Sequence, residues 1–445
     1  MKRRLDHLWI WDGAAAVRRG SILLDGEHVV AILEAGDAPP PDYVADERID
    51  GRGRLAIPGL ICAHTHLYSS LARGMALSGF SPTTFTEILQ QLWWRLDKAL
   101  DEDLVRMSAR VGAMEAARCG VTTLIDHHAS PRAIDGSLDL MQEEVCSTVG
   151  LRGAFCYELS DRDGATSASA GIEENLRFLE KMDRNPAKVG AHFGLHASFT
   201  VSEKTLAQVA ERIPDDAGIH IHVAEGPEDE IHCESEHGHR IIHRLDRYGL
   251  LRPNSILVHC LHVNDEEKDL IAERDAVVVH NPRSNMNNAV GSFDLDGFLA
   301  RGVLSGLGTD GLGANLFAEL FTAALAQKHT QGDCQAGGFP QLNDLLFVGN
   351  SRIAERTFAG LRLGRLEHGG PADLAILDYV PPTPLDGGTI LGHLLFGIGV
   401  HSLRVQDLFV AGVPVLRDGA FAEIDEAAVY ERSRSEAARL WSRID

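Results

Sequence analysis

Six residues in the sequence carry side chains that could bind a divalent metal ion and use it in hydrolysis: His64, His66, His222, Glu225, His259 and Asp310. His64 and His66 are two residues apart after an apolar run, so on a strand both rings point to the same face. This pair alone is weak evidence in a chain with 21 histidines. With His222 and Asp310, however, it forms a suitable ligand set for one ion that keeps a position for water. Such an ion lowers the pKa of that water toward neutrality, so the predicted chemistry is hydrolysis.

Glu225 and His259 are the candidate catalytic partners of this ligand set. Glu225 lies three residues after His222, just beyond the end of the same apolar run, and is predicted to shuttle a proton. His259 ends a later run and is predicted to hydrogen-bond the water or the developing oxyanion. Asp310 is expected to help to deprotonate the water as well as to bind the metal.

Eight apolar runs, separated by amphipathic segments, must position these residues. The runs comprise residues 55–64, 121–128, 151–159, 189–197, 217–225, 255–263, 275–282 and 303–311. Their apolar character is continuous rather than alternating, which is typical of parallel strands that are buried on both faces. Eight strand–helix units favour a (β/α)8 barrel, with a doubly wound sheet as the competing fold. In a barrel the carboxyl ends of the strands form one mouth, where the polar residues that end these runs would meet.

Short β-type segments occupy both ends of the chain and indicate a second, smaller domain. We predict a β-sandwich built from residues 1–55 and 361–445, whose second part includes a C-terminal helix, beside a barrel over residues 56–360. We find no internal repeat, linker or low-complexity tract in the sequence.

The overall composition excludes several classes of partner. The 445-residue chain has a formal net charge of −22, which argues against nucleic-acid and anionic-membrane partners. Its seven scattered cysteines contain no C-x-x-C pair, so neither a disulfide framework nor a cysteine-rich zinc site is expected. We find no secretory signal and no apolar stretch long enough to span a membrane, and we therefore expect a cytoplasmic location.

Other polar residues have structural interpretations that compete with functional ones. An isolated histidine such as His196 or His280 is more often a hydrogen-bonded core residue than a ligand, and we expect His220 to be structural. The segment GLGTDG at residues 306–311 matches the dinucleotide-binding pattern. It lies in the last unit, however, and no acidic residue follows a second strand at the required distance. A nucleotide-dependent oxidoreductase is therefore a weak alternative.

Five motifs together resemble the amidohydrolase superfamily, in the branch of cytosine deaminase, guanine deaminase and the chlorohydrolases. In chain order they are PGLICAHTH, HVAE from His222, VHC with His259, HNPRSN, and LGTDG with Asp310. The stretches LWWRLDKAL, IDHHASP and NPRSNMNNAVG are most similar to the SsnA group of aminohydrolases. The resemblance implies a metal-dependent barrel, a β-sandwich formed by both chain ends, and the ligand and catalytic residues named above. It also implies a single metal, because strand 4 carries His196 instead of the bridging lysine of two-metal relatives.

The predicted activity is hydrolytic deamination of an amidine-type C–NH2 group in a purine-, pterin- or pyrimidine-like ring, with Zn²⁺ as the expected metal and Fe²⁺ as the alternative. The candidate substrate-binding residues are His196, His128, Arg73, Trp93 and Asn285. Hydrolysis of another C–N bond or of a C–Cl bond at the same site is the nearest alternative, and a non-catalytic scaffold is a weaker one. The expected partner is a small heterocyclic substrate, and a homodimer is the assembly considered.

Overall fold

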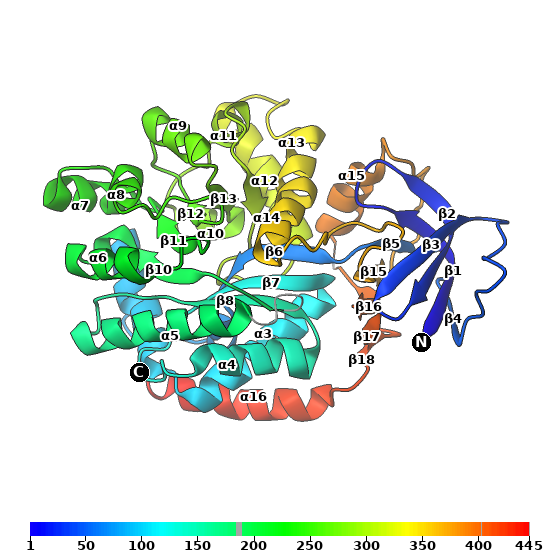
Figure 1. The fold of residues 1–445 in the computed structure, drawn as a ribbon, viewed down its shortest axis with the longest axis horizontal. Helices are drawn as coiled ribbons and strands as arrows, with labels where there is room; N and C mark the ends of the chain where they lie inside the picture. The colour runs from blue at the N-terminus through cyan, green and yellow to red at the C-terminus, as the bar shows by residue number, and fades with distance from the viewer. Residues whose placement is uncertain (184–188, 402, 445) are drawn as a thin grey trace.

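A closed barrel of parallel strands forms the larger part of the molecule. The computed structural model describes residues 1–183, 189–401 and 403–444. Within them the barrel strands are β6 (Leu60–Thr65), β7 (Val121–His128), β8 (Arg152–Tyr157), β9 (Val189–Ala191), β10 (Phe193–Ala197), β11 (Ile219–Val223), β12 (Ile256–His259), β13 (Val277–His280) and β14 (Ser305–Leu307). They pair in the orders β6-β7-β8-β9 and β10-β11-β12-β13-β14, all in parallel. The predicted barrel is thus confirmed, with helices packed around it (Figure 1).

The fourth apolar run is divided rather than continuous. Strand β9 pairs with β8, whereas β10 pairs with β11, and His192 stands between the two strands. An isolated bridge between Leu159 and Leu195 joins the two groups of strands on this side. The single strand predicted over residues 189–197 is therefore two short strands, of which the first pairs with one group of barrel strands and the second with the other.

The barrel closes where β6 meets the segment after β14. The amide of Thr309 donates to the carbonyl oxygen of His64 at 2.9 Å, and Thr65 bridges to Asp310. Gly308 makes this approach possible, because a Cβ atom there would stand only 2.7 Å from the same carbonyl. The closure places Asp310 beside the two histidines of the first strand.

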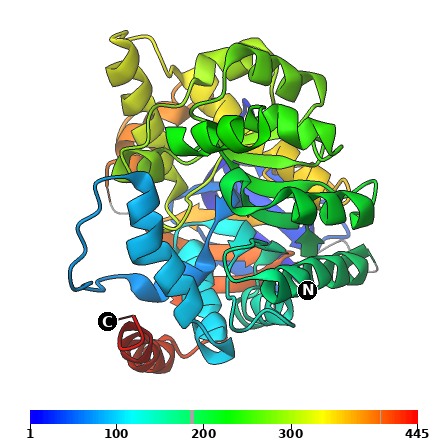
Figure 2. The ribbon, with the colours of Figure 1, turned by 90° about the vertical axis from the view of Figure 1, so that its left-hand side faces the viewer.

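A helical segment after β6 covers the site. It comprises η1 (Leu67–Ala72), α1 (Phe85–Ile88), the π-helical turn η2 (Leu89–Trp93) and α2 (Trp94–Ala99). Thr84 caps the start of α1 through its side chain, which accepts a hydrogen bond from the amide of Glu87. The segment forms a blue helix toward the viewer in Figure 2. π-Helical turns inside helices are frequent at functional sites, and this one carries Trp93.

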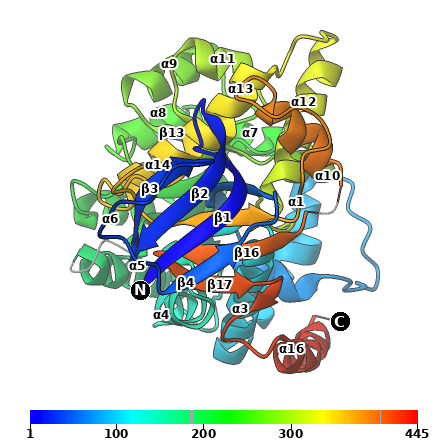
Figure 3. The same ribbon diagram turned by 90° about the vertical axis from the view of Figure 1, so that its right-hand side faces the viewer.

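Both chain ends combine into the smaller domain, as predicted. Its strands are β1 (Lys2–Trp11), β2 (Val17–Asp25), β3 (His28–Glu34), β4 (Glu47–Asp50), β5 (Leu55–Pro58), β15 (Leu374–Leu377), β16 (Val405–Val410), β17 (Val413–Arg417) and β18 (Ala420–Phe421). In the described residues they form one nine-stranded sheet, in which β5 and β15 pair antiparallel and so join the two ends. Figure 3 shows the blue strands β1 and β4 from the start of the chain beside the red-orange strands β16 and β17 from its end. Leu5, Ile22, Leu374 and Phe409 belong to its own buried core.

The predicted domain limits differ from the structure at two places. Strand β5 pairs with β1 and β15, so the small sheet extends to Pro58 and the barrel begins with β6, whereas the sequence placed the boundary at residue 55. One apolar run crosses this boundary, which is why the pattern did not reveal it. Helix α16 (Glu426–Trp441) packs along α3 (Glu102–Arg118) of the barrel, and Arg439 there is ion-paired with Asp101. The C-terminal helix therefore belongs to the barrel side of the molecule.

Candidate functional site

Four side chains from three places in the barrel converge at its mouth. His64 and His66 lie on or just after β6, His222 lies on β11, and Asp310 follows β14. The Nε2 atom of His66 lies 3.1 Å from Asp310 Oδ1 and 3.1 Å from His222 Nε2. The Nε2 atom of His64 lies 3.6 Å from the same aspartate oxygen. One ligand atom of each residue thus lies within 4.8 Å of all the others.

The opposite nitrogen of each histidine is held by the protein. His66 Nδ1 donates to the carbonyl oxygen of His127 at 2.6 Å, and His222 Nδ1 donates to that of His196 at 2.8 Å. His64 Nδ1 lies 2.9 Å from Nε2 of His220, which assigns a supporting position to His220. Such bonds fix the ring tautomer and orient the free nitrogen toward a metal.

These groups fit one divalent cation. The Nε2 atom of His64 is buried and has no hydrogen-bond partner among the described residues. Burial lowers the pKa of His64 to about 3 and holds that of His222 well below its ordinary value, so both rings are neutral, as ligands must be. Burial also acts on His66, but the Asp310 carboxylate outweighs it and raises the pKa of His66 to about 9. A cation would replace that proton as the positive charge beside Asp310.

A second acid and a further histidine lie beside this ligand set. Glu225 Oε2 is 3.5 Å from His259 Nε2, and Glu225 Oε1 accepts a hydrogen bond from Asn288 at 3.1 Å. Burial raises the pKa of Glu225 to about 7, against the opposing influence of His259. His259 donates a hydrogen bond from Nδ1 to Asn285 at 2.7 Å, whereas its Nε2 atom has no hydrogen-bond partner among the described residues. A carboxyl group that titrates near neutrality is suited to proton transfer.

The backbone around these residues is strained. The φ angles of His259 and Asp310 are 72° and 52°, in the left-handed region, and that of Ala224 before Glu225 is 46°. Side chains other than glycine rarely adopt such conformations, which cost energy and concentrate at functional sites. The amide of Ala224 is held by Asp229, whose carboxylate accepts its hydrogen bond at 3.0 Å.

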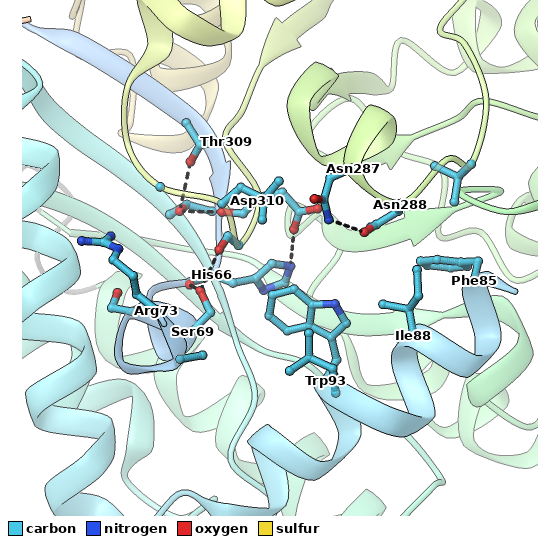
Figure 4. Close-up of a pocket in the computed structure, with 18 of the residues that line it drawn as sticks. His66, Ser69, Arg73, Phe85, Ile88, Trp93, Asn287, Asn288, Thr309 and Asp310 are labelled. Carbon is cyan, nitrogen blue, oxygen red and sulfur yellow. Dashed lines mark hydrogen bonds and ion pairs between the residues drawn. The ribbon is translucent and has the colours of Figure 1, made fainter. Parts of the chain in front are cut away.

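Two connected cavities meet at the ligand set. The outer cavity has a volume of about 900 Å³ and the inner one about 50 Å³, and His66, Trp93 and Asp310 line both. Figure 4 shows the Trp93 ring beside His66 and Asp310. Tyr68, Phe85 and Trp93 supply aromatic surface to the inner cavity, as is typical of sites that bind small molecules.

The five predicted substrate-binding residues are placed differently. His196 and Trp93 line the inner cavity. Arg73 lines only the outer cavity, where Glu115 binds its guanidinium group through both carboxylate oxygens. Asn285 lines neither of these two cavities and instead holds His259 and His280. His128 also lines neither, because its ring is fully buried and its Nε2 is bonded to Ser130 at 2.9 Å. For the last two the prediction of direct substrate contact is corrected.

A buried acidic group was missed by the analysis of the sequence. Glu158 follows β8 and lines the inner cavity, and Asp97 of α2 lines it as well. Both carboxylates lie 3.3 Å from the guanidinium group of Arg162. Burial acts to raise the pKa of Glu158, but its interactions with His196 and His127 outweigh burial and hold that pKa well below its usual range. Glu158 ends the third apolar run, the one run for which no polar end residue was considered, so the signal was present.

Comparisons with known proteins agree with this geometry. The family model described as "Amidohydrolase family" matches residues 55–415. A 5-methylthioadenosine/S-adenosylhomocysteine deaminase of Haloarcula marismortui is 30% identical over 436 residues, which cover 96% of this chain and 95% of the relative. A 5'-deoxyadenosine deaminase of Methanopyrus kandleri is 30% identical over 433 residues, 96% of each chain. This chain therefore belongs to the amidohydrolase family.

Solved structures give the same fold. An adenosine deaminase from Xanthomonas campestris with bound zinc superposes with a TM-score of 0.85 at 24% identity, over 99% of this chain and 98% of the other. The atrazine chlorohydrolase TrzN from Arthrobacter aurescens with zinc has a TM-score of 0.77 at 21% identity, over 99% and 100% of the two chains.

The predictions of an amidohydrolase barrel and of a metal-dependent hydrolytic deaminase are confirmed. The closer resemblance to the SsnA group stays a prediction. Among the described residues, we find no helix with the length and apolar character needed to cross a membrane.

Proposed function

We propose that this deaminase acts on a purine-like or pyrimidine-like ring in the inner cavity, and that Zn²⁺ is its native metal. One observation carries the proposal: three members of the ligand set and Glu225 line one cavity with aromatic walls, and His64 and His259 lie directly beside them. The net reaction replaces the ring C–NH2 by C=O, consumes one water and releases one ammonia.

The metal would be held by His64, His66, His222 and Asp310. Three imidazoles and a carboxylate are a typical ligand set for Zn²⁺, and Fe²⁺ is the alternative. When bound, the cation supplies a hydroxide nucleophile at neutral pH and electrostatic stabilisation of developing negative charge.

Side chains of the protein carry out the proton transfers and stabilise the developing charge. Glu225 transfers a proton from its Oε2 atom to the ring nitrogen beside the amino-bearing carbon, takes up the proton of the new hydroxyl group as the C=O bond forms, and delivers it to the leaving amine. The proton that Asp310 takes from the water then returns Glu225 to its starting state. His259 directs its Nε2 atom toward the same point and, when this atom also carries a hydrogen, donates it to the new oxygen and stabilises the charge that develops there. The second oxygen of Asp310 is fixed by the hydroxyl group of Ser284 at 2.5 Å, which orients this carboxylate to take a proton from the attacking water.

The substrate is tested with the compounds on which the relatives act and with simpler rings. The panel contains 5'-methylthioadenosine, 5'-deoxyadenosine, adenosine, adenine, guanine, cytosine and pterin, and the measurement is ammonia release by the zinc-loaded protein. Release from at least one compound, abolished in Glu225→Gln, is the expected result. Turnover of a chlorinated triazine with no ammonia from any member of the panel would replace deamination by C–Cl hydrolysis. Absence of all turnover and of metal uptake would favour the scaffold. The cytoplasmic location and the homodimer remain predictions from the sequence.

A further inference from the structure

Two hydrogen-bond acceptors stand side by side on the wall of the inner cavity. They are Nε2 of His196 on β10 and Oε1 of Glu158 after β8, which lie 3.6 Å apart. Both residues line the same cavity as Glu225 and Asp310. The mechanism described above uses neither of them.

A hydrogen-bond chain fixes the tautomer of His196. The hydroxyl group of Thr200 donates its only hydrogen to the carbonyl oxygen of Ala197 at 3.1 Å. Thr200 Oγ1 therefore accepts from the neighbouring His196 Nδ1 at 2.7 Å, so the hydrogen of the imidazole resides on Nδ1. The Nε2 atom of His196 is left as an acceptor toward the cavity.

Glu158 is held as an acceptor by Arg162 and His127 behind it. Its Oε1 atom accepts from Arg162 Nη2 at 3.3 Å, and its Oε2 atom lies 3.3 Å from Nδ1 of His127. The other face of His127 bonds the carbonyl oxygen of His220 at 3.0 Å. Arg162 stacks on Trp94 at 5.0 Å and is not among the residues that line the inner cavity. Arg162 thus compensates the charge of Glu158 from the protein side, while Glu158 itself lines the cavity.

We propose that His196 Nε2 and Glu158 Oε1 recognise N–H donors on the ring edge opposite the scissile amino group, and that the enzyme prefers heterocycles unsubstituted at that edge. The ring centroids of His196 and of the expected metal ligand His222 lie 5.7 Å apart, and the same cavity is lined by Glu225, so the pair lies close to the site of the proposed reaction. The inference rests on the proposed function, which it makes more specific. A methyl or sugar group on that ring nitrogen removes the donor and leaves buried acceptors unpaired, a costly loss in a closed site.

The test compares matched substrates within one protein preparation. Ammonia release is measured for cytosine against 1-methylcytosine, for adenine against 9-methyladenine, and for adenosine against 2',3'-dideoxyadenosine. We expect kcat/KM to favour the unmethylated base by about 30-fold or more, the effect of a hydrogen bond to a charged acceptor. Because the ratio is taken within a preparation, a partly unfolded variant does not disturb it.

Variants assign the preference to the two acceptors. Glu158→Gln should reduce the ratio to below about 3-fold. Thr200→Val, which frees the tautomer of His196, should also reduce it. Glu144→Gln is the matched control, because this buried glutamate is ion-paired with Arg110 and lines neither cavity, and its ratio should stay at the wild-type value.

Each result decides between distinct conclusions. Equal rates for the base and its methyl analogue, or an unchanged ratio in Glu158→Gln, would overturn the inference and leave deamination standing. A preference for adenosine over both adenine and the dideoxy compound would show that the acceptors bind sugar hydroxyl groups instead, and would also overturn it. No ammonia from any of these compounds or from the larger panel would remove the proposed function, and the inference with it.

Discussion

Replacement of Glu225 by glutamine is the sharpest test of the catalytic geometry. The glutamine amide has nearly the same size as the carboxyl group and retains an oxygen that can accept the hydrogen bond from Asn288, which lies 3.1 Å from Oε1 of Glu225 in the native protein. It cannot carry a proton between the ring nitrogen and the leaving amine. The change therefore removes one chemical function while the cavity keeps its shape.

The expected magnitude follows from the environment of the carboxyl group. Burial raises the pKa of Glu225 to about 7, so near neutral pH the group both accepts and donates a proton at little cost. Positioned acid–base catalysis of this kind contributes about 10²- to 10⁴-fold in rate. At about 1.36 kcal/mol per tenfold, kcat should fall by the equivalent of about 2.7 to 5.4 kcal/mol. KM should change much less, because the aromatic walls and His196 remain in place.

The assay is steady-state ammonia release, with metal content and melting temperature measured on the same samples. Glu144→Gln again serves as the control for loss of a buried carboxylate outside the site, and it should retain wild-type kcat. A decrease in kcat of less than tenfold in fully metal-loaded Glu225→Gln would refute the assigned role. So would a larger decrease that added metal restores, because the defect would then lie in metal binding.

Three further predictions concern the metal, the contact between the domains and a buried acid. Removal of the metal with a chelator should abolish activity and lower the free energy of unfolding, and added zinc should restore both. The loss of stability should be about 4 kcal/mol if the ion was present at a thousandfold its dissociation constant. An unchanged melting temperature with no zinc uptake would contradict the ligand assignment. Asp373→Asn should cost about 3–5 kcal/mol in urea unfolding, because it removes a charged group 2.7 Å from the buried guanidinium of Arg152 of β8, whereas Glu173→Gln at the exposed pair with Arg212 should cost less than about 1 kcal/mol; equal costs would refute this difference. Burial raises the pKa of Glu319 from 4.5 to about 8, so the native state binds the proton more tightly and stability falls as the pH rises through that window. Glu319→Gln should therefore become increasingly more stable than the wild type between pH 5 and pH 8, and a constant difference would be inconsistent with this linkage.

The barrel and the ligand set could be predicted because each rests on a local pattern. Continuous apolar runs indicate buried parallel strands, and polar residues at the ends of successive runs indicate a common mouth. His64, His66, His222 and Asp310 meet in the structure because strand ends of a closed barrel must meet. The same reasoning applied to the third run would have found Glu158.

The predictions differed from the structure where the position of a residue in the sequence does not determine which way its side chain points or which strand its segment pairs with. Asn285 and His128 lie near the mouth in sequence, yet one side chain turns behind His259 and the other bonds Ser130. The domain boundary was misplaced because Leu55–Pro58 is as apolar as the barrel strand that follows it, although it pairs with β15 from the other end of the chain.

The amino-acid sequence by itself determined the architecture, the chemistry of the ligand set and the acid beside it, since these depend on residue type, periodicity and order. Only the tertiary structure decided which nitrogen of each histidine faces the site, because the tautomers depend on carbonyl groups and side chains of neighbouring strands. Only the tertiary structure, too, placed Glu158 beside His196, through the bridge between Leu159 and Leu195 that joins two neighbouring strands of the barrel. These two acceptors lie far apart in the chain and 3.6 Å apart in space. The sequence thus defines the class of reaction, and the packing of the strands decides which side chains line the cavity beside the ligand set.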